Sequence, residues 1–129
     1  GICLGPVNTA AGHAIAYPLG TLLNLPHGLA NAIVFPHVLA FNQPAVTMKT
    51  DEVATALKLG HGLSQQDLLS AAEAFCSDLG IEMSLSAHGA TERDLPRYAG
   101  DAHAIPRRMD NNPVEMSETD VLGIYRAAL

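Results

Sequence analysis

Residues 9–42 read TAAGHAIAYPLGTLLNLPHGLANAIVFPHVLAFN, and their pattern indicates the fold class. It is rich in alanine and has few β-branched runs, which favours helices. The pattern predicts a helix over 9–23, with a kink or an early end at Pro18, because proline lacks the N–H that a helix interior needs. A turn at 24–26 then leads into a second helix over about 26–39, which can begin at a proline.

Capping residues and apolar spacing predict the helices in the rest of the chain. Ser64 is a typical N-cap with Asp67 three residues later, and Ser117 with Asp120 repeats this pattern. We expect helices over 51–59, 64–79 and 91–103 (the last capped by Thr91) and a final helix from Ser117, with loops at 41–44 and 110–113. No strand signal, internal repeat or low-complexity tract is visible in the sequence. The expected fold class is therefore all-α, a helical bundle.

Charge is distributed unevenly along the chain. Residues 1–48 contain no Asp, Glu, Lys or Arg, and all the charged residues lie between Lys49 and Arg126. Surface elements normally carry charge, so this stretch is either the core of the domain or a face that packs against further protein. The chain also begins at Gly1, with no initiator methionine and no polar leader. We therefore expect the C-terminal part of a longer protein.

Composition argues against several functional classes. A chain of 129 residues, 48% of them hydrophobic, fits one small domain. A net charge of -6 with seven Lys and Arg argues against a nucleic-acid partner, and no apolar run approaches the length of a membrane span. Cys3 and Cys76 lie far apart and do not indicate a disulfide framework, which points to a reducing cytoplasm. Both are expected to be small core residues.

Three titratable residues of the uncharged stretch form a candidate site. His13 and Tyr17 are four residues apart and share a helix face, and His27 opens the next helix. A tight connection at 23–25 would fold the two helices together and bring His13 near His27. Neutral imidazoles in an uncharged pocket are good ligands for a divalent metal ion. On spacing alone, core histidines that are hydrogen-bonded to backbone are the commoner case.

The residues around these histidines form a longer signature. The segments GHAIAYPLG (12–20), NLPHGLANA (24–32) and PHVLAFN (36–42) resemble the iron-containing alcohol dehydrogenases, a family related to dehydroquinate synthase and glycerol dehydrogenase. Looser matches follow at Leu79-Gly80-Ile81, Leu95-Pro96, Asn111-Asn112-Pro113 and the last helix. The resemblance covers essentially the whole chain but only the C-terminal third of a family member.

The resemblance implies that residues 1–129 are an all-helical, metal-binding C-terminal domain, separate from an N-terminal nucleotide-binding α/β domain that lies upstream. A cleft between these domains would hold NAD or NADP and a divalent metal (iron, with zinc as the alternative) bound by one aspartate and three histidines. By motif match, His13 and His27 are the last two ligands, and the other ligands and the cofactor-binding residues precede Gly1. The metal would act as a Lewis acid during hydride transfer between an alcohol, or an aldehyde or ketone, and the nicotinamide.

The same resemblance implies a cytoplasmic homo-oligomer that acts on a small alcohol or carbonyl substrate, with the present part inactive alone. Tyr17 stands where many members carry another histidine. Its hydroxyl either donates a hydrogen bond to a metal-bound water or the substrate, or its ring lines the pocket. Two alternatives stay open: a non-catalytic helical interaction domain that kept the motif, and a maleylacetate or hydroxyacid reductase on the same scaffold. The choice of NAD or NADP also stays open.

The remaining histidines and arginines are expected to have structural roles. His37 belongs to the motif without being a family ligand, so we expect it to pack or to form hydrogen bonds between helices. Exposure to solvent is expected for His61, His88 and His103. Arg107 and Arg108 are expected to form surface ion pairs near Asp110 rather than a phosphate site.

Overall fold

The computed structural model describes residues 9–129, and its regular structure is entirely helical over that range. The elements follow in the order α2 (Ala11–Leu22), α3 (His27–Asn42), α4 (Thr47–Ala56), α5 (Gln65–Asp78), the 3-10 helix η1 (Ser86–His88), α6 (Leu95–His103), α7 (Pro106–Met109) and α8 (Glu118–Ala127). The predicted all-α fold class is confirmed. None of the described helices combines the length and the apolar character that crossing a membrane requires.

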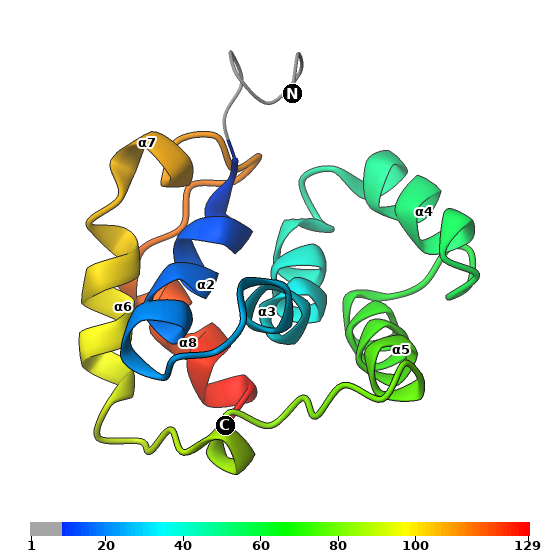
Figure 1. The fold of residues 1–129 in the computed structure, drawn as a ribbon. Helices are drawn as coiled ribbons and strands as arrows, with labels where there is room; N and C mark the ends of the chain where they lie inside the picture. The colour runs from blue at the N-terminus through cyan, green and yellow to red at the C-terminus, as the bar shows by residue number, and fades with distance from the viewer. Residues whose placement is uncertain (1–8) are drawn as a thin grey trace.

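Helix α3 lies in the middle of the molecule (Figure 1). It packs against α2 on one side and against α5 on the other, while α6 packs against both α2 and α8. The uncharged stretch thus supplies the central helix pair, α2 and α3. Residues of that stretch at the α2–α3 turn nevertheless stay exposed, among them Asn24, Pro26 and Gly28.

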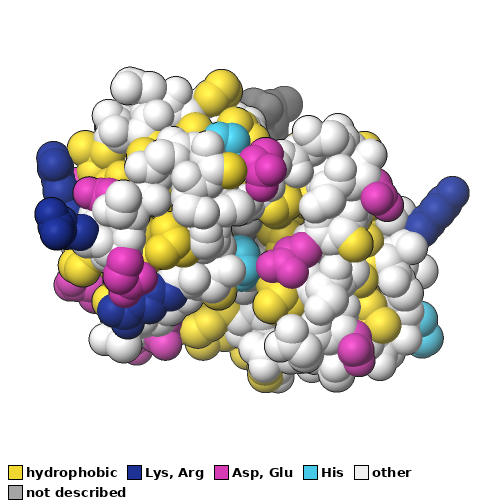
Figure 2. Space-filling model, turned by 90° about the horizontal axis from the view of Figure 1, so that it is seen from below, with side chains coloured by type: hydrophobic (Ala, Val, Ile, Leu, Met, Phe, Trp, Pro, Cys, Tyr) yellow, Lys and Arg dark blue, Asp and Glu magenta, His cyan; other side chains and the backbone are white. Residues whose placement is uncertain are grey.

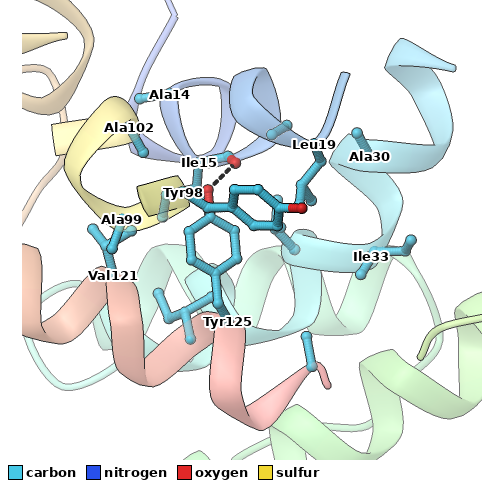
Figure 3. Packing of buried hydrophobic residues seen from close by; sticks show 14 of the residues in the cluster. Ala14, Ile15, Leu19, Ala30, Ile33, Tyr98, Ala99, Ala102, Val121 and Tyr125 are labelled. Carbon is cyan, nitrogen blue, oxygen red and sulfur yellow. Dashed lines mark hydrogen bonds between the residues drawn. The ribbon is translucent and has the colours of Figure 1, made fainter. Parts of the chain in front are cut away.

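The main core lies between α2, α3, α6 and α8 (Figure 3). Small side chains on facing helices, such as Ala14, Ala30 and Ala102, are completely buried and let the helix backbones approach closely. Tyr125 of α8 is buried among them, and its ring meets the edge of the Tyr98 ring with centroids 6.0 Å apart. Close packing of a few large residues among many small ones accounts for the alanine-rich composition.

Two of the predicted helix caps are present as expected. The Ser64 hydroxyl accepts a hydrogen bond from the Asp67 N–H at 3.2 Å. At α8 the capping box is complete, because the Asp120 carboxylate in turn accepts from the Ser117 N–H at 2.8 Å. These bonds satisfy backbone donors that the first turn of a helix otherwise leaves without partners.

Several predicted boundaries were wrong. Helix α3 continues to Asn42, so the loop expected at 41–44 begins later. Helix α4 begins at Thr47 rather than at residue 51, and it ends before Lys58, which has a left-handed φ of 60°. Pro18 does not end its helix early, and Pro36 likewise lies inside α3; both rings are fully buried, and tertiary packing outweighs the lost backbone hydrogen bond.

The segment around α6 and α7 also differs from the prediction. Thr91 does not cap α6: its N–H and its hydroxyl both donate to the Asp94 carboxylate, at 3.0 and 2.6 Å, and this closes a separate turn. Helix α6 begins after that turn, at Leu95. The short helix α7 was not predicted. It packs against α2 and thereby carries two arginines toward that helix.

Candidate metal centre

His13 and His27 lie side by side at the α2–α3 hairpin. Their ring centroids are 5.3 Å apart and the ring planes are tilted by 54°. The half-buried His13 is in the first turns of α2, and the exposed His27 is the first residue of α3. The connection between the helices is tight: Asn24 has a φ of 55°, and the Leu25 N–H donates to the Leu19 carbonyl at 3.2 Å.

Asn31 restrains the His27 ring from one turn further along α3. Its amide nitrogen lies 3.3 Å from Nε2 and 3.4 Å from Nδ1 of His27, and it donates to the His27 backbone carbonyl at 2.9 Å. Which ring nitrogen accepts depends on the tautomer. A neutral imidazole has one nitrogen lone pair, so an amide N–H that donates to it has to give way when His27 binds a metal ion.

The electrostatic surroundings keep the His13 imidazole neutral. Burial lowers the pKa of His13, and the charges of His27 and Arg108 lower it further. A metal ion binds the neutral form of imidazole, through a nitrogen lone pair that protonation would occupy. No acidic residue exists in the first 48 positions to oppose this shift from α2 or α3.

Tyr17 lies one turn after His13 and is 52% exposed. The guanidinium carbon of Arg108 lies over the Tyr17 ring, 5.5 Å from its centroid. This position corrects the expectation of a surface ion pair with Asp110, because the ion pairs of the described residues do not include Arg108. No sequence pattern predicts this contact, because it joins α7 to α2 across about ninety intervening residues.

The histidine pair meets part of what a divalent metal requires. Two neutral imidazoles suit two positions of such a site, where zinc or iron takes nitrogen ligands. Within residues 9–129, no group of three or more His, Cys, Asp or Glu side chains lies together in a way that could hold an ion. The pair therefore fits as part of a ligand set, and the described residues do not complete it.

A largely apolar pocket of about 360 Å³ opens beside His13. It is lined by Gly12, His13, Asn31, Val34, Phe35, Val38, Leu39 and Asn42. Sequence analysis missed this pocket, although its α3 residues recur at the spacing of one helix face. An apolar cavity that ends at a candidate ligand can hold the carbon chain of a small molecule.

A reciprocal amide pair closes one end of that pocket. The side-chain nitrogen of Asn42 donates to the Asn112 oxygen at 3.0 Å, and Asn112 donates back at 2.7 Å and to the Val114 carbonyl at 2.8 Å. The neighbouring Asn111 donates to the Thr9 carbonyl at 3.1 Å. The loop that contains Asn111 and Asn112 is thus hydrogen-bonded both to the end of α3 and to the residues that precede α2.

The other histidines lie away from the pair. His37 is buried between α3 and α5, with Nε2 3.6 Å from the Glu73 carboxylate, which agrees with a packing role. It lines a separate pocket of about 450 Å³ between α3, α5 and α8. Figure 2 shows a furrow across one face of the molecule, with acidic and histidine side chains along it.

Of the three histidines expected to be solvated, His61 and His103 are exposed. His88 is half-buried, with Nε2 2.9 Å from the Glu82 carbonyl. Cys76 is buried, as expected for a small core residue, and Cys3 lies outside the described residues.

Comparison with known proteins identifies a consistent group of relatives. The family model described as "Fe-containing alcohol dehydrogenase family, C-terminal" matches residues 1–129. Long-chain-alcohol dehydrogenase 1 of Geobacillus thermodenitrificans is 29% identical over 99% of this chain and 34% of its own length. Maleylacetate reductase 1 of Rhodococcus opacus is 29% identical over 99% of this chain and 33% of its own.

A solved structure shows the same fold. The alcohol dehydrogenase from Oenococcus oeni is 26% identical, with a TM-score of 0.81 over 95% of this chain and 33% of its own. The chain thus spans about a third of the length of the proteins it matches.

Proposed function

The chain belongs to the iron-containing alcohol dehydrogenase family, and from this premise we propose that it is the helical, metal-binding part of an NAD(P)-dependent oxidoreductase. The reaction interconverts an alcohol with an aldehyde or ketone. The observation that carries the proposal is the pairing of His13 with His27, whose ring centroids lie 5.3 Å apart. The two residues meet where a tight turn joins the uncharged helices α2 and α3.

His13 and His27 would each supply one imidazole nitrogen to a divalent metal ion. When bound, this ion supplies Lewis-acid chemistry by polarising the oxygen of the alcohol or carbonyl. The other roles in the site belong to residues of this chain. Asn31 contacts the His27 ring, burial favours the unprotonated form of His13, and the largely apolar pocket beside His13 adjoins the site.

The proposal requires donors from outside the described residues. His13 and His27 have no third ligating neighbour within residues 9–129, whereas four-ligand sites are the usual arrangement for such an ion. The relatives are about three times as long as this chain, which leaves room for a nucleotide-binding domain. We propose that the missing ligands and the NAD(P) site belong to that domain, and that the 129 residues alone are inactive.

Tyr17 is assigned to the wall of the site rather than to the ligand set. It is on the same helix face as His13 and half-exposed, and its ring face is covered by a cation. The uncharged, exposed turn at residues 24–28 continues this wall. The turn itself contains no Asp, Glu, Lys or Arg, so a second domain can cover it without burying an unpaired charge there.

The test is turnover by the complete protein. We expect NAD- or NADP-linked oxidation of simple alcohols that a chelator abolishes and that added Fe²⁺ or Zn²⁺ restores. A chelated control that regains activity after Mg²⁺ alone would point to a different site. A complete protein that binds a stable protein partner through this face, and oxidises no alcohol with either nucleotide, would support the interaction-domain alternative instead.

A further inference from the structure

Arg108 occupies an unusual position for an arginine. It is half-buried on the short helix α7, and its guanidinium carbon lies 5.5 Å from the centroid of the Tyr17 ring. A positive charge therefore lies beside the candidate site, one helical turn from a candidate metal ligand.

No carboxylate of the described chain neutralises this charge. The ion pairs of residues 9–129 are His37 with Glu73, His61 with Asp51 and Arg126 with Glu92. Residues 1–48, which include both site helices, contain no acidic residue at all. By contrast, Arg126 donates to Glu92 at 2.7 Å, as a structural arginine commonly does.

The side chain retains its capacity to bind an anion. A guanidinium has five N–H donors in a planar fork, and none of them is used by a hydrogen bond within the described residues. The contact with Tyr17 is a cation–π contact and uses none of these donors in a hydrogen bond. A planar edge of this kind matches a carboxylate, which it can bind through two parallel hydrogen bonds.

We propose that Arg108 binds a carboxylate carried by the substrate of this site, so that the enzyme prefers hydroxy acids and oxo acids over neutral alcohols and carbonyls. This inference rests on the proposed function. In the oxidation, the hydroxyl carbon of a hydroxy acid transfers a hydride to NAD(P)⁺ and the hydroxyl proton leaves to solvent, which yields the oxo acid, NAD(P)H and one proton. The carboxylate does not react, and it is the group through which Arg108 binds the substrate.

The placement sets the size of the preferred substrate. Tyr17 follows His13 by one turn, a rise of about 6 Å along the helix axis. Because the Arg108 guanidinium lies over the Tyr17 ring, we expect an anion bound there to be about one helical turn from His13 along α2, which a short carbon chain can span. Short hydroxy acids fit this separation.

The experiment compares charged and neutral substrates of equal shape in the complete, metal-loaded protein. Lactate is measured against isopropanol, and γ-hydroxybutyrate against n-butanol. The variants are Arg108→Gln, which removes the charge, Arg108→Lys, which keeps the charge without the fork, and Arg107→Gln. Arg107 is exposed on the same short helix and is the matched control, because its loss changes the net charge equally.

For Arg108→Gln we expect kcat/KM for the hydroxy acid to fall roughly 10- to 100-fold, mainly through KM, with the neutral alcohol nearly unchanged. Arg108→Lys should retain part of the preference, and Arg107→Gln should retain all of it. Equal losses for charged and neutral substrates would indicate a packing role for Arg108 and would overturn the inference. A rise in the KM of the nucleotide alone would overturn it too, because the anion would then be a nucleotide phosphate.

A binding measurement separates this inference from the proposed function. Butyrate, which has no hydroxyl to oxidise, is titrated into each protein by calorimetry, and metal content is checked in every variant. If no alcohol is oxidised, the proposed function fails, yet butyrate binding that is lost in Arg108→Gln and kept in Arg107→Gln still supports an anion site. Butyrate binding that is absent, or equal in all variants, contradicts it.

Discussion

The hydroxyl of Tyr125 donates a hydrogen bond to the backbone carbonyl of Ile15 at 2.6 Å, which joins the last helix to the helix that carries His13 (Figure 3). Both residues are completely buried. Burial raises the pKa of Tyr125 well above its ordinary value, so the phenol stays a donor. One bond between residues 110 positions apart therefore fixes α2, and with it the site, against the C-terminal end of the chain.

Removing this hydroxyl should destabilise the fold without changing its shape. For Tyr125→Phe we expect a loss of about 1–2 kcal/mol in the free energy of unfolding, because a buried hydrogen bond is lost while the ring remains. Tyr98→Phe is the control, since no hydrogen bond from the Tyr98 hydroxyl is seen among the described residues. Chemical denaturation of the complete protein measures both. Equal effects of the two substitutions would contradict a special role for Tyr125.

The capping box of α8 should contribute to stability by itself. In Ser117→Ala the Asp120 N–H loses its acceptor, and we expect about 1 kcal/mol of destabilisation. Ser70 is exposed within α5, so Ser70→Ala should be neutral or slightly stabilising, because alanine favours helix interiors. The two melting temperatures provide the comparison. A Ser117→Ala protein as stable as Ser70→Ala would show that the cap does not contribute to the free energy of unfolding.

The buried His37 should make stability depend on pH. Burial lowers its pKa from 6.5, and the smaller, opposing effect of Glu73 does not reverse this. The unfolded state therefore binds a proton at a higher pH than the folded state does. The contribution of His37 is present above pH 6.5 and is lost as pH falls below that value. Stability measured from about pH 7 to pH 5 should fall less steeply in His37→Gln than in the parent protein.

The exposed His61 gives the control for that experiment. His61→Gln is the matched control because it removes one imidazole that is exposed to solvent rather than buried. If His37→Gln has the same pH dependence as the parent, or a steeper one, the burial of His37 does not govern it.

The Cys76 thiol should react slowly in the folded protein. It is buried, burial raises its pKa, and its Sγ lies 3.9 Å from the Ala32 carbonyl. Thiol reagents react with the thiolate, so the raised pKa slows modification, and burial slows it further by limiting access to the sulfur. The rate of labelling by a thiol reagent, compared between the parent and Cys76→Ala, isolates this residue from Cys3. Labelling of Cys76 as fast in the folded state as in denaturant would disprove its burial.

Local signals in the sequence predicted the helices whose ends are set by their own residues. Ser64 and Ser117 form caps with partners three residues away, so short-range pattern was sufficient. The start of α4 was missed because no capping side chain marks it, and Thr91 was misread because its bonds to Asp94 close a turn instead of a helix. Boundaries decided by such competing local bonds are not encoded in apolar spacing.

The site was predictable in part for a related reason. The hairpin that joins His13 to His27 is short, so sequence distance constrains spatial distance. The pairing of Arg108 with Tyr17 and of Asn42 with Asn112 depends instead on how distant helices pack. The family signature identified the two histidines, but it gave no indication that a cation lies beside them.

The metal content of the complete protein shows whether His13 and His27 bind an ion. The parent, His13→Ala, His27→Ala and the exposed control His61→Ala are purified in parallel, and Fe and Zn are measured by mass spectrometry. We predict about one divalent ion per chain in the parent and in His61→Ala, and a large loss in His13→Ala and His27→Ala, because each removes one ligand. Folded His13→Ala and His27→Ala proteins that keep the metal content of the parent would contradict the assignment of this pair as metal ligands.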